Sequence, residues 1–287
     1  MHGRSFQQAE RRTFDVVAIG NAVVDVISHA DDSFLMRHGM VKGTMRLVPD
    51  EATAEALYAE MGPAVEISGG SAANTVVGVA SLGGRAAFIG RVADDQLGEV
   101  FTHDIRAAGV EYRTPPVRGA GSTGRCLVLV TPDAQRTMNT YLGVSNQLQA
   151  DDLDEELIRE AQVLYCEGYL WDLPDAKDAL VHAMKVAEAA GARVAFTLSD
   201  PFCVDRHREE LLELVEGPVD ILFANEAEIC SLYGVPDVQA AAEKVAGVCE
   251  IACLTMSERG VPGGGRGESG ARGGDARRSG GRHHWSR

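Results

Sequence analysis

The 287-residue chain is 45% hydrophobic and 24% charged, values typical of a soluble globular protein with one large core or two modest ones. Its net charge of −15 argues against a nucleic-acid or anionic-membrane partner, because a polyanion would be repelled over most of the surface. No apolar run approaches the roughly 18 residues that span a bilayer, and the amino-terminal residues lack a signal-peptide core, so we expect a cytoplasmic protein. The six cysteines stand mostly alone in apolar runs, which favours small buried residues in a reducing compartment.

Strand-like and helix-like segments alternate along most of the chain. Residues 1–13 are polar, and we expect them to form a flexible arm. From Phe14 onward, short apolar runs typical of buried strands alternate with helical patterns that stop at glycine. This alternation predicts an α/β domain over residues 14–260, with a mostly parallel sheet covered on both faces. The strand-like runs are 14–19, 86–89, 163–166, 193–198, 219–223 and 251–255, and the helical patterns are 71–82, 95–108 and 174–190.

One segment interrupts this alternation. Residues 125–130 and 136–142 are predicted to pair as a β-hairpin, because Pro132-Asp133 between them favours a turn. A hairpin inserted in an α/β chain is a candidate lid. We therefore expect lid segments near residues 41–48 and 112–142.

A glycine pair leads into a small-residue helix in the sequence Ser68-Gly69-Gly70-Ser71-Ala72-Ala73-Asn74-Thr75. Glycines let backbone amides approach a ligand closely, and a helix start favours oxygen-rich or anionic groups. A tight turn into a close-packed helix explains the glycines equally simply. Asn74 favours a binding site, because a polar side chain one turn into an Ala/Val helix has no packing reason to be there.

Polar residues also follow the first, fifth and sixth of these strand-like runs. Asn21 and Asp25 come after the first strand, where a carboxylate at the carboxyl edge of a parallel sheet is suited to accept from paired hydroxyls or, alternatively, to cap a turn. Asn225 is a plausible helix N-cap, and Glu228 one turn later is suited to hold Mg²⁺ through water. At the end of the last strand-like run, hydroxyls and a glycine suited to a nucleotide are supplied by Thr255, Ser257 and Gly260.

Together, and in this order, these segments resemble the PfkB or ribokinase-like family of carbohydrate and nucleoside kinases. Residues 68–101 resemble the first signature of that family, and GNAVVDV, NEAE and LTMSERG fall where the family would place them. The segments SGGSAANT, QRTMNTYLG, YCEGYLWD and LSDPFCVDRHR look most like its bacterial adenosine-kinase-like branch. The resemblance implies a Rossmann-like α/β domain with a small β lid, ATP as donor, and Mg²⁺ bridging the phosphates.

The resemblance also implies a role for each matched residue. In phosphoryl transfer the protein takes little part in covalent chemistry, so its contribution to catalysis should come mainly from positioning the substrates and neutralising charge. Arg136 would reach the transferring phosphate from the lid hairpin, and Tyr169 would stack on a base. Asn225 and Glu228 match the family's phosphate and Mg²⁺ motif, with Glu228 as the metal contact. Its ATP loop is matched by Thr255, Ser257 and Gly260. The implied hydroxyl-binding residues are Asn21, Asp25, Gly69, Gly70 and Asn74.

The second signature of that family, a DTxGAGD-type segment, is not found in the sequence. Its aspartate would be the general base and its amides the anion hole, so no catalytic base is identified. Gly273-Gly274-Asp275 is not an equivalent, because no strand precedes it and no apolar helix follows it. Residues 261–287 hold nine glycines and six arginines, which predicts a disordered tail. In a chain with 23 arginines and 4 lysines, this abrupt change favours an out-of-frame tail that replaces the end of the fold.

Three functions follow from these observations. The leading hypothesis is an ATP-dependent kinase acting on a hydroxyl of a nucleoside, in the manner of adenosine kinase. The alternative is a PfkB sugar kinase for a ribose- or fructose-type substrate. A hypothesis of another class is a catalytically inactive fragment that lacks the base and anion hole. A dinucleotide-binding oxidoreductase is less favoured, because no GxGxxG follows the first strand.

Overall fold

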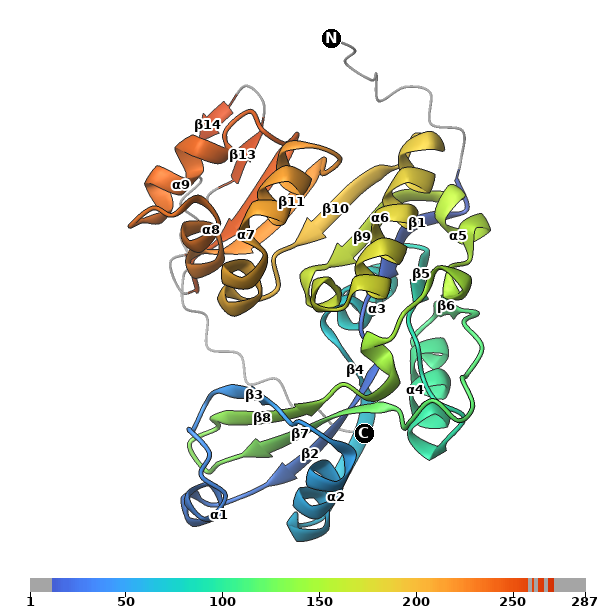
Figure 1. The fold of residues 1–287 in the computed structure, drawn as a ribbon, viewed down its shortest axis with the longest axis vertical. Coiled ribbons are helices and arrows are strands. Elements are labelled where there is room, and N and C mark those ends of the chain that lie inside the picture. Colours follow the sequence, from blue (N-terminus) through green and yellow to red (C-terminus); the bar gives the residue numbers. More distant parts are fainter. Residues whose placement is uncertain (1–11, 258–259, 261–262, 266–267, 271–287) are drawn as a thin grey trace.

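The computed structural model describes residues 12–257, 260, 263–265 and 268–270. In that part of the chain the strands form two sheets, one of nine strands in the order β14-β13-β12-β11-β10-β9-β1-β5-β6 and one of five in the order β3-β8-β7-β2-β4 (Figure 1). The nine-stranded sheet, here called the main sheet, is α/β and mostly parallel, as the sequence predicts. The five-stranded sheet, here called the lid sheet, lies beside its carboxyl edge.

All six strand-like runs predicted from the sequence are strands of the main sheet. Their register is parallel throughout, from Val16 opposite Ala86 at one end to Asn225 opposite Thr255 at the other. The strands are β1 (Phe14–Ile19), β5 (Ala86–Ile89), β6 (Val110–Tyr112), β9 (Ala161–Glu167), β10 (Arg193–Thr197), β11 (Ile221–Asn225), β12 (Ile251–Thr255), β13 (Gly263–Gly265) and β14 (Glu268–Gly270).

Helices cover both faces of the central strands, as predicted. The three helical patterns correspond to α3, α4 and α6. Of α8 only the start at Asn225 was predicted, and α5, α7 and α9 were not predicted. Apolar side chains of β1, β5 and β9 divide between two cores, one against α3 and α4 and the other against α5 to α9. The helices are α3 (Ser71–Ser81), α4 (Gln96–Ala107), α5 (Glu155–Arg159), α6 (Pro174–Ala189), α7 (Pro201–Glu216), α8 (Glu226–Tyr233) and α9 (Val238–Val245).

Strands β11 and β12 differ from this pattern. Their residues Leu222 and Leu254 are buried in the core against α7 to α9. On the opposite face, Phe223 and Cys253 are only half-buried, and the described helices do not pack there as they do on β1. The prediction of helices on both faces therefore holds for the central strands but not for this end of the described sheet.

The lid sheet is larger than the sequence predicted. The hairpin is confirmed, with β7 (Gly124–Val130) paired antiparallel to β8 (Arg136–Tyr141), and β3 (Met45–Leu47) adds a short strand within residues 41–48. Two further strands, β2 (Val23–His29) and β4 (Ala64–Gly69), were missed, although β2 is an inner strand of the lid sheet, between β7 and β4. The assignment of residues 112–142 to the lid is wrong at its start, because Tyr112 pairs with Phe88 in the main sheet.

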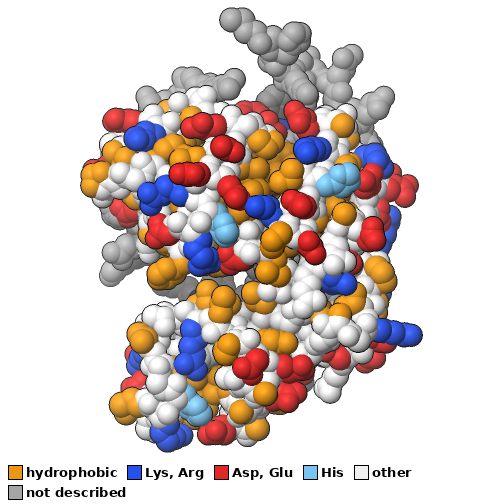
Figure 2. Space-filling model, in the orientation of Figure 1, with side chains coloured by type: hydrophobic (Ala, Val, Ile, Leu, Met, Phe, Trp, Pro, Cys, Tyr) orange, Lys and Arg blue, Asp and Glu red, His pale blue; other side chains and the backbone are white. Residues whose placement is uncertain are grey.

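One face of the lid sheet is packed and the other turns toward the main sheet. Val24 and Val26 of β2 and Leu127 of β7 are buried with side chains of α1 (Asp32–Arg37) and α2 (Glu51–Glu60). The next residues along each strand, Asp25 and Cys126, therefore point to the opposite face. Figure 1 shows α1 and α2 on the side of the lid sheet away from the main sheet, and Figure 2 shows a notch between the two parts of the molecule.

The two chain ends fall largely outside the described residues. The expected flexible arm, residues 1–13, is described only from Arg12, whose side chain donates to the Ala161 and Ala190 carbonyls, so its last residues are anchored. The expected disordered tail includes strands β13 and β14, which differ from the prediction because backbone pairing with the edge of β12 needs no apolar side chains. Gly273-Gly274-Asp275 lies outside the described residues.

No helix in the described part of the chain is both long and apolar enough to cross a bilayer.

Candidate active site

The candidate site lies where the chain crosses between the main sheet and the lid sheet. The first crossing, residues 20–22, joins β1 to β2, and the second, Gly70, joins β4 to α3. Because β2 and β4 are paired, with Val23 opposite Gly69, these two crossings lie side by side. The structure thus brings Asn21, Asp25 and the glycine pair together, as the sequence predicts.

Asp25 lies on the lid face that turns toward the main sheet. Its carboxyl group is largely buried, and burial raises its pKa to about 6. No hydrogen bond to this carboxylate is found among the described residues, so both oxygens keep their capacity to accept. A buried carboxylate without an internal partner is costly for the protein, which is typical of a group that a ligand completes.

The two glycines are required by this geometry. A Cβ on Gly69 would lie 2.4 Å from Cγ of Asp25, so any larger residue would displace the carboxylate. Gly70 has φ of 103° and a Cβ there would lie 2.3 Å from the Asn21 carbonyl oxygen. The glycines therefore let the two crossings pack against each other. The tight-turn interpretation is confirmed, and contact of these glycines with a ligand stays a prediction.

Asn74 lies one turn into α3 and is exposed, with its amide donating to the Gly70 carbonyl at 2.8 Å. Its side chain is not used for packing, and its role toward a ligand stays a prediction.

Glu167, the last residue of β9, is a site residue that the sequence analysis missed. Its side chain is 1% exposed and accepts hydrogen bonds from three N–H groups. Oε1 accepts from the Asn21 amide at 2.6 Å and from Asn21 Nδ2 at 2.8 Å, while Oε2 accepts from the Ala72 amide at 3.0 Å. Burial raises the pKa of Glu167, and the donors from Asn21 and Ala72 oppose that rise. A glutamate that ends an apolar strand, YCEG, was the available signal.

Tyr169 follows β9 in a short 3₁₀ turn (Gly168–Asp172) at the same edge of the main sheet. Its hydroxyl donates to the Ser199 carbonyl at 3.1 Å, and its amide donates to Ser199 Oγ at 3.3 Å. Ser199 has φ of 74°, an unfavourable conformation for serine that these contacts hold in place. Burial raises the Tyr169 pKa, so the phenol stays neutral. Phe202, at the start of α7, is 75% exposed at this edge and was not singled out from the sequence.

Asn225 and Glu228 form a capping box at the start of α8. Asn225 Oδ1 accepts from the Glu228 amide at 2.9 Å, while Glu228 accepts from the Asn225 amide at 2.9 Å and from Asn225 Nδ2 at 2.6 Å. The helix-cap interpretation of Asn225 is confirmed. Glu228 is 5% exposed and burial raises its pKa, so its geometry fits contact with a metal ion through water better than direct coordination.

The predicted ATP loop lies beside this capping box. Thr255 is the last residue of β12, directly opposite Asn225 in the parallel register. Behind it, Met256 N donates to the Gly260 carbonyl at 2.8 Å and Gly260 N donates to the Ser257 carbonyl at 3.2 Å, which closes a tight turn. The turn uses positive φ at Ser257 and Gly260. The three residues predicted for the loop are thus gathered at the carboxyl edge of β12.

Arg136 lies apart from the hydroxyl-binding residues. It pairs with Val130 at the far end of the β7–β8 hairpin, six residues along β2 from the crossing, and its side chain is exposed. That displacement is about 20 Å along the strand. Figure 1 shows the hairpin end at the left of the lid, on the same side of the molecule as α8 and away from β9. Its position is compatible with a phosphate contact and not with the hydroxyl site.

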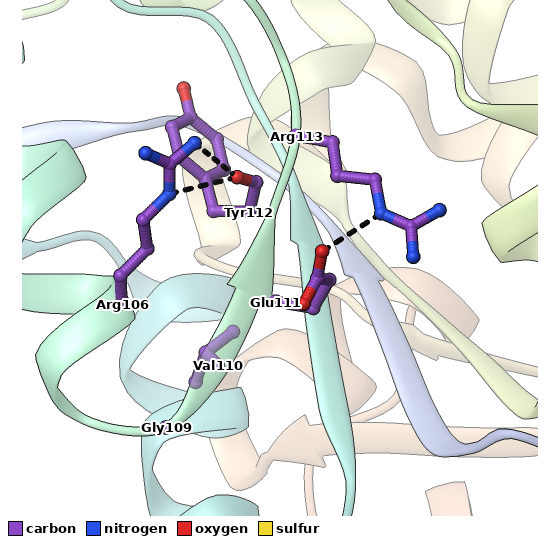
Figure 3. Close-up of a pocket in the computed structure, with 6 residues that line it drawn as sticks. All are labelled: Arg106, Gly109, Val110, Glu111, Tyr112 and Arg113. Atoms are coloured by element: carbon purple, nitrogen blue, oxygen red, sulfur yellow. Dashed lines mark hydrogen bonds and ion pairs between the residues drawn. The ribbon is translucent and has the colours of Figure 1, made fainter.

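A separate hollow lies on the edge strand β6, lined by Arg106, Gly109, Val110, Glu111, Tyr112 and Arg113 (Figure 3). Arg106 donates to the Tyr112 carbonyl from Nε at 3.1 Å and from Nη2 at 2.7 Å, and Arg113 pairs with Glu111 at 2.8 Å. Both guanidinium groups are engaged within the hollow, which shares no residue with the predicted site. We interpret these contacts as protection of a sheet edge.

Within the described residues, no three histidine, cysteine, aspartate or glutamate side chains are grouped closely enough to hold a metal ion. Any divalent ion at this site would therefore need ligands from a bound substrate and from water.

Comparisons with known proteins identify the family to which this chain belongs. The model of the pfkB family of carbohydrate kinases matches residues 43–262, and the chain belongs to this family. The structure of a Sinorhizobium meliloti adenosine kinase is 50% identical, with a TM-score of 0.85 over 93% of this chain and 82% of that one. A probable sugar kinase from Rhizobium etli is 49% identical, with a TM-score of 0.83 over 90% of this chain and 78% of that one.

More distant relatives include kinases with different acceptors. The Escherichia coli guanosine-inosine kinase is 26% identical over 256 residues, 86% of this chain. A Zea mays fructokinase is 29% identical over 177 residues, 60% of this chain. The chain spans 59% of the length of the guanosine-inosine kinase and 54% of that of the fructokinase.

Proposed function

We propose that this protein is an ATP-dependent kinase that transfers a phosphoryl group to a hydroxyl of a nucleoside. The observation that carries the proposal is the Asp25 carboxylate, which is largely buried, has no hydrogen bond from the described residues, and packs against the glycine turn. Paired hydroxyls of a ribose are suited to donate to both oxygens of such a carboxylate.

The aromatic surroundings favour a nucleoside over a free sugar. Tyr169 is held against Ser199 at the sheet edge that carries Glu167, and Phe202 exposes its ring at the start of α7. An aromatic ring stacks on a nucleobase with about 1–3 kcal/mol per base, a contribution that a sugar does not receive. The similarity to an adenosine kinase and to a guanosine-inosine kinase supports the same choice.

The ATP side of the site would be formed by Asn225, Glu228 and the turn that contains Thr255, Ser257 and Gly260. A bound Mg²⁺–ATP complex would supply the phosphoryl group and neutralise its charge. Glu228 would meet the ion through water, since its two oxygens already accept from Asn225. Arg136 would add positive charge at the transferring phosphate when the hairpin end approaches α8.

A sugar kinase is the second candidate, favoured by the similarity to a probable sugar kinase and to fructokinases. The two candidates share the hydroxyl-binding residues and differ in whether Tyr169 contributes to affinity.

Calorimetric titration of the 287-residue chain with adenosine, guanosine, inosine, ribose and fructose tests the acceptor, and release of ADP in the presence of Mg²⁺ tests transfer. We expect binding of at least one nucleoside at least about tenfold tighter than either sugar, the equivalent of about 1.4 kcal/mol. Tighter binding of a sugar would replace the nucleoside with the second candidate. Nucleoside binding without ADP formation would support the binding site and contradict catalysis by this chain.

A further inference from the structure

We propose that Glu167 is a positioning residue. Its carboxylate orients the Asn21 side chain and holds the two chain crossings in the geometry that binds the acceptor, without contacting the acceptor itself. This inference rests on the proposed function, because it concerns the same acceptor site. It goes beyond that function in assigning the geometry of the site to a buried side chain from a third segment, the end of β9.

Glu167 accepts hydrogen bonds from two separate segments of the chain. Its oxygens accept from three N–H groups, the Asn21 amide, Asn21 Nδ2 and the Ala72 amide, and the Ser71 hydroxyl is a further partner. Asn21 belongs to the crossing from β1 to β2, and Ala72 to the start of α3 after the crossing from β4. One carboxylate therefore holds both crossings at once.

The same carboxylate orients the Asn21 side chain. Its Nδ2 donates to Glu167, while its Oδ1 lies 3.1 Å from Ser145 Oγ, which shares its one proton with the Leu142 carbonyl at 2.6 Å. These opposite partners fix which way the amide group points. One hydrogen on Nδ2 and one lone pair on Oδ1 remain for a ligand, so Asn21 is presented to the acceptor in a single orientation.

The space around the carboxylate is narrow. A Cβ on Gly20 would lie 2.6 Å from Cδ of Glu167 and 2.5 Å from Cβ of Ala72. Glu167 therefore fills the space between the first crossing and α3, and the absence of a side chain at position 20 makes this arrangement possible. Glu167 is 1% exposed and both of its oxygens already accept from Asn21 or Ala72, so it is not open to a ligand in this arrangement.

These contacts require an acceptor at both oxygens. Glu167→Gln keeps the size of the side chain but places an NH₂ group against at least one N–H donor, which cannot form that hydrogen bond. A Gln side chain should therefore loosen one crossing while leaving the core around β9 intact. Cys166→Ala is a matched control, because Cys166 is also fully buried in β9 but points into the opposite core.

The experiment compares the wild-type chain, Glu167→Gln and Cys166→Ala by amide hydrogen exchange and by calorimetric titration with adenosine, guanosine and inosine. We expect Glu167→Gln to speed exchange in peptides that cover residues 20–22 and 70–74, with β10 and α6 unchanged. We also expect its nucleoside affinity to fall about 10- to 100-fold, the loss of one or two charge-assisted hydrogen bonds. Cys166→Ala should change neither.

The outcomes separate this role from the proposed function. Unchanged exchange at both crossings in a folded Glu167→Gln variant would overturn the positioning role, whatever the affinity. Equal losses of affinity in Glu167→Gln and Cys166→Ala would also overturn it, because they would reflect a general loosening of β9. A third outcome is that the wild type binds none of the three nucleosides while the crossings still exchange faster in Glu167→Gln. That result would support the role of Glu167 in holding the two crossings together and would contradict a nucleoside as the acceptor.

Discussion

The Asp25 carboxylate lies directly against the backbone of Gly69, so close that a methyl group on that glycine would come within 2.4–2.6 Å of the three carboxyl atoms. The two residues face each other diagonally across the β2–β4 pair, on the lid face toward the main sheet. This contact explains why a glycine stands at the end of a strand, where its loss of chain entropy is unfavourable.

Gly69→Ala should therefore weaken acceptor binding by about 10- to 100-fold, because the new methyl displaces Asp25 and the hydrogen bonds of an ionised group are lost. Gly78→Ala in α3 is the matched control, since nothing lies within 4 Å of its added Cβ. That change should stabilise the helix by about 0.5–1 kcal/mol and leave binding unchanged. Calorimetric titration and thermal unfolding of both variants measure the effects, and equal affinities would contradict the role of Gly69.

The crossing itself was only partly predictable. GNAVVDV and SGGSAANT identified Asn21, Asp25, Gly69 and Gly70, because polar residues and glycines beside apolar runs are visible in the sequence. Strands β2 and β4 were missed, since β4 is mostly exposed and carries little apolar alternation. Glu167 was missed because its place in the site depends on hydrogen-bond donors from residues 21 and 72, which are far from it in the chain. Local patterns find the ends of strands but not the partners that meet there.

Asp25 should make the stability and the binding of this protein respond to pH in opposite directions. Its pKa is raised by burial to about 6 from the usual 3.8, so between these values the folded chain binds more protons than the unfolded chain. The free energy of unfolding should therefore fall as the pH rises from about 4 to 6, because ionisation of Asp25 is unfavourable in the folded state. Acceptor affinity should rise over the same range, since binding uses the carboxylate.

Asp25→Asn tests this reasoning. At pH 7 the free energy of unfolding of the variant should exceed that of the wild type by up to about 3 kcal/mol, because burial raises the pKa of Asp25 from 3.8 to about 6. The variant should also lose acceptor affinity. Denaturant unfolding at pH 4, 5, 6 and 7 should show the difference shrinking as the pH falls. A difference that stays constant across this range would show that Asp25 does not titrate there.

The capping box at α8 makes a separate prediction about the ATP side. Asn225→Ala should cost about 0.5–2 kcal/mol of stability, as the loss of an N-cap does elsewhere. It should also weaken binding of Mg²⁺–ATP, because the Glu228 carboxylate loses its contact with Asn225 Nδ2, one of the two that orient it. Asp237→Ala is the control, since Asp237 caps α9 through the Ala240 amide at 2.9 Å and lies outside the predicted ATP loop. Denaturant unfolding and nucleotide titration should show equal destabilisation but a loss of ATP affinity in Asn225→Ala alone.

Tyr169 distinguishes the two candidate acceptors most directly. Tyr169→Ala removes the ring, which should weaken nucleoside binding by about 1–3 kcal/mol if the base stacks there, and leave ribose or fructose binding nearly unchanged. Tyr169→Phe is the matched control, because it keeps the ring and removes only the hydroxyl that donates to the Ser199 carbonyl at 3.1 Å. Since that contact helps to hold Ser199 at positive φ, the Phe variant should lose stability but keep most nucleoside affinity. Equal losses of nucleoside affinity in the two variants would mean that Tyr169 acts by holding Ser199 and not by stacking, and the argument for a nucleoside would then depend on the other residues of the site.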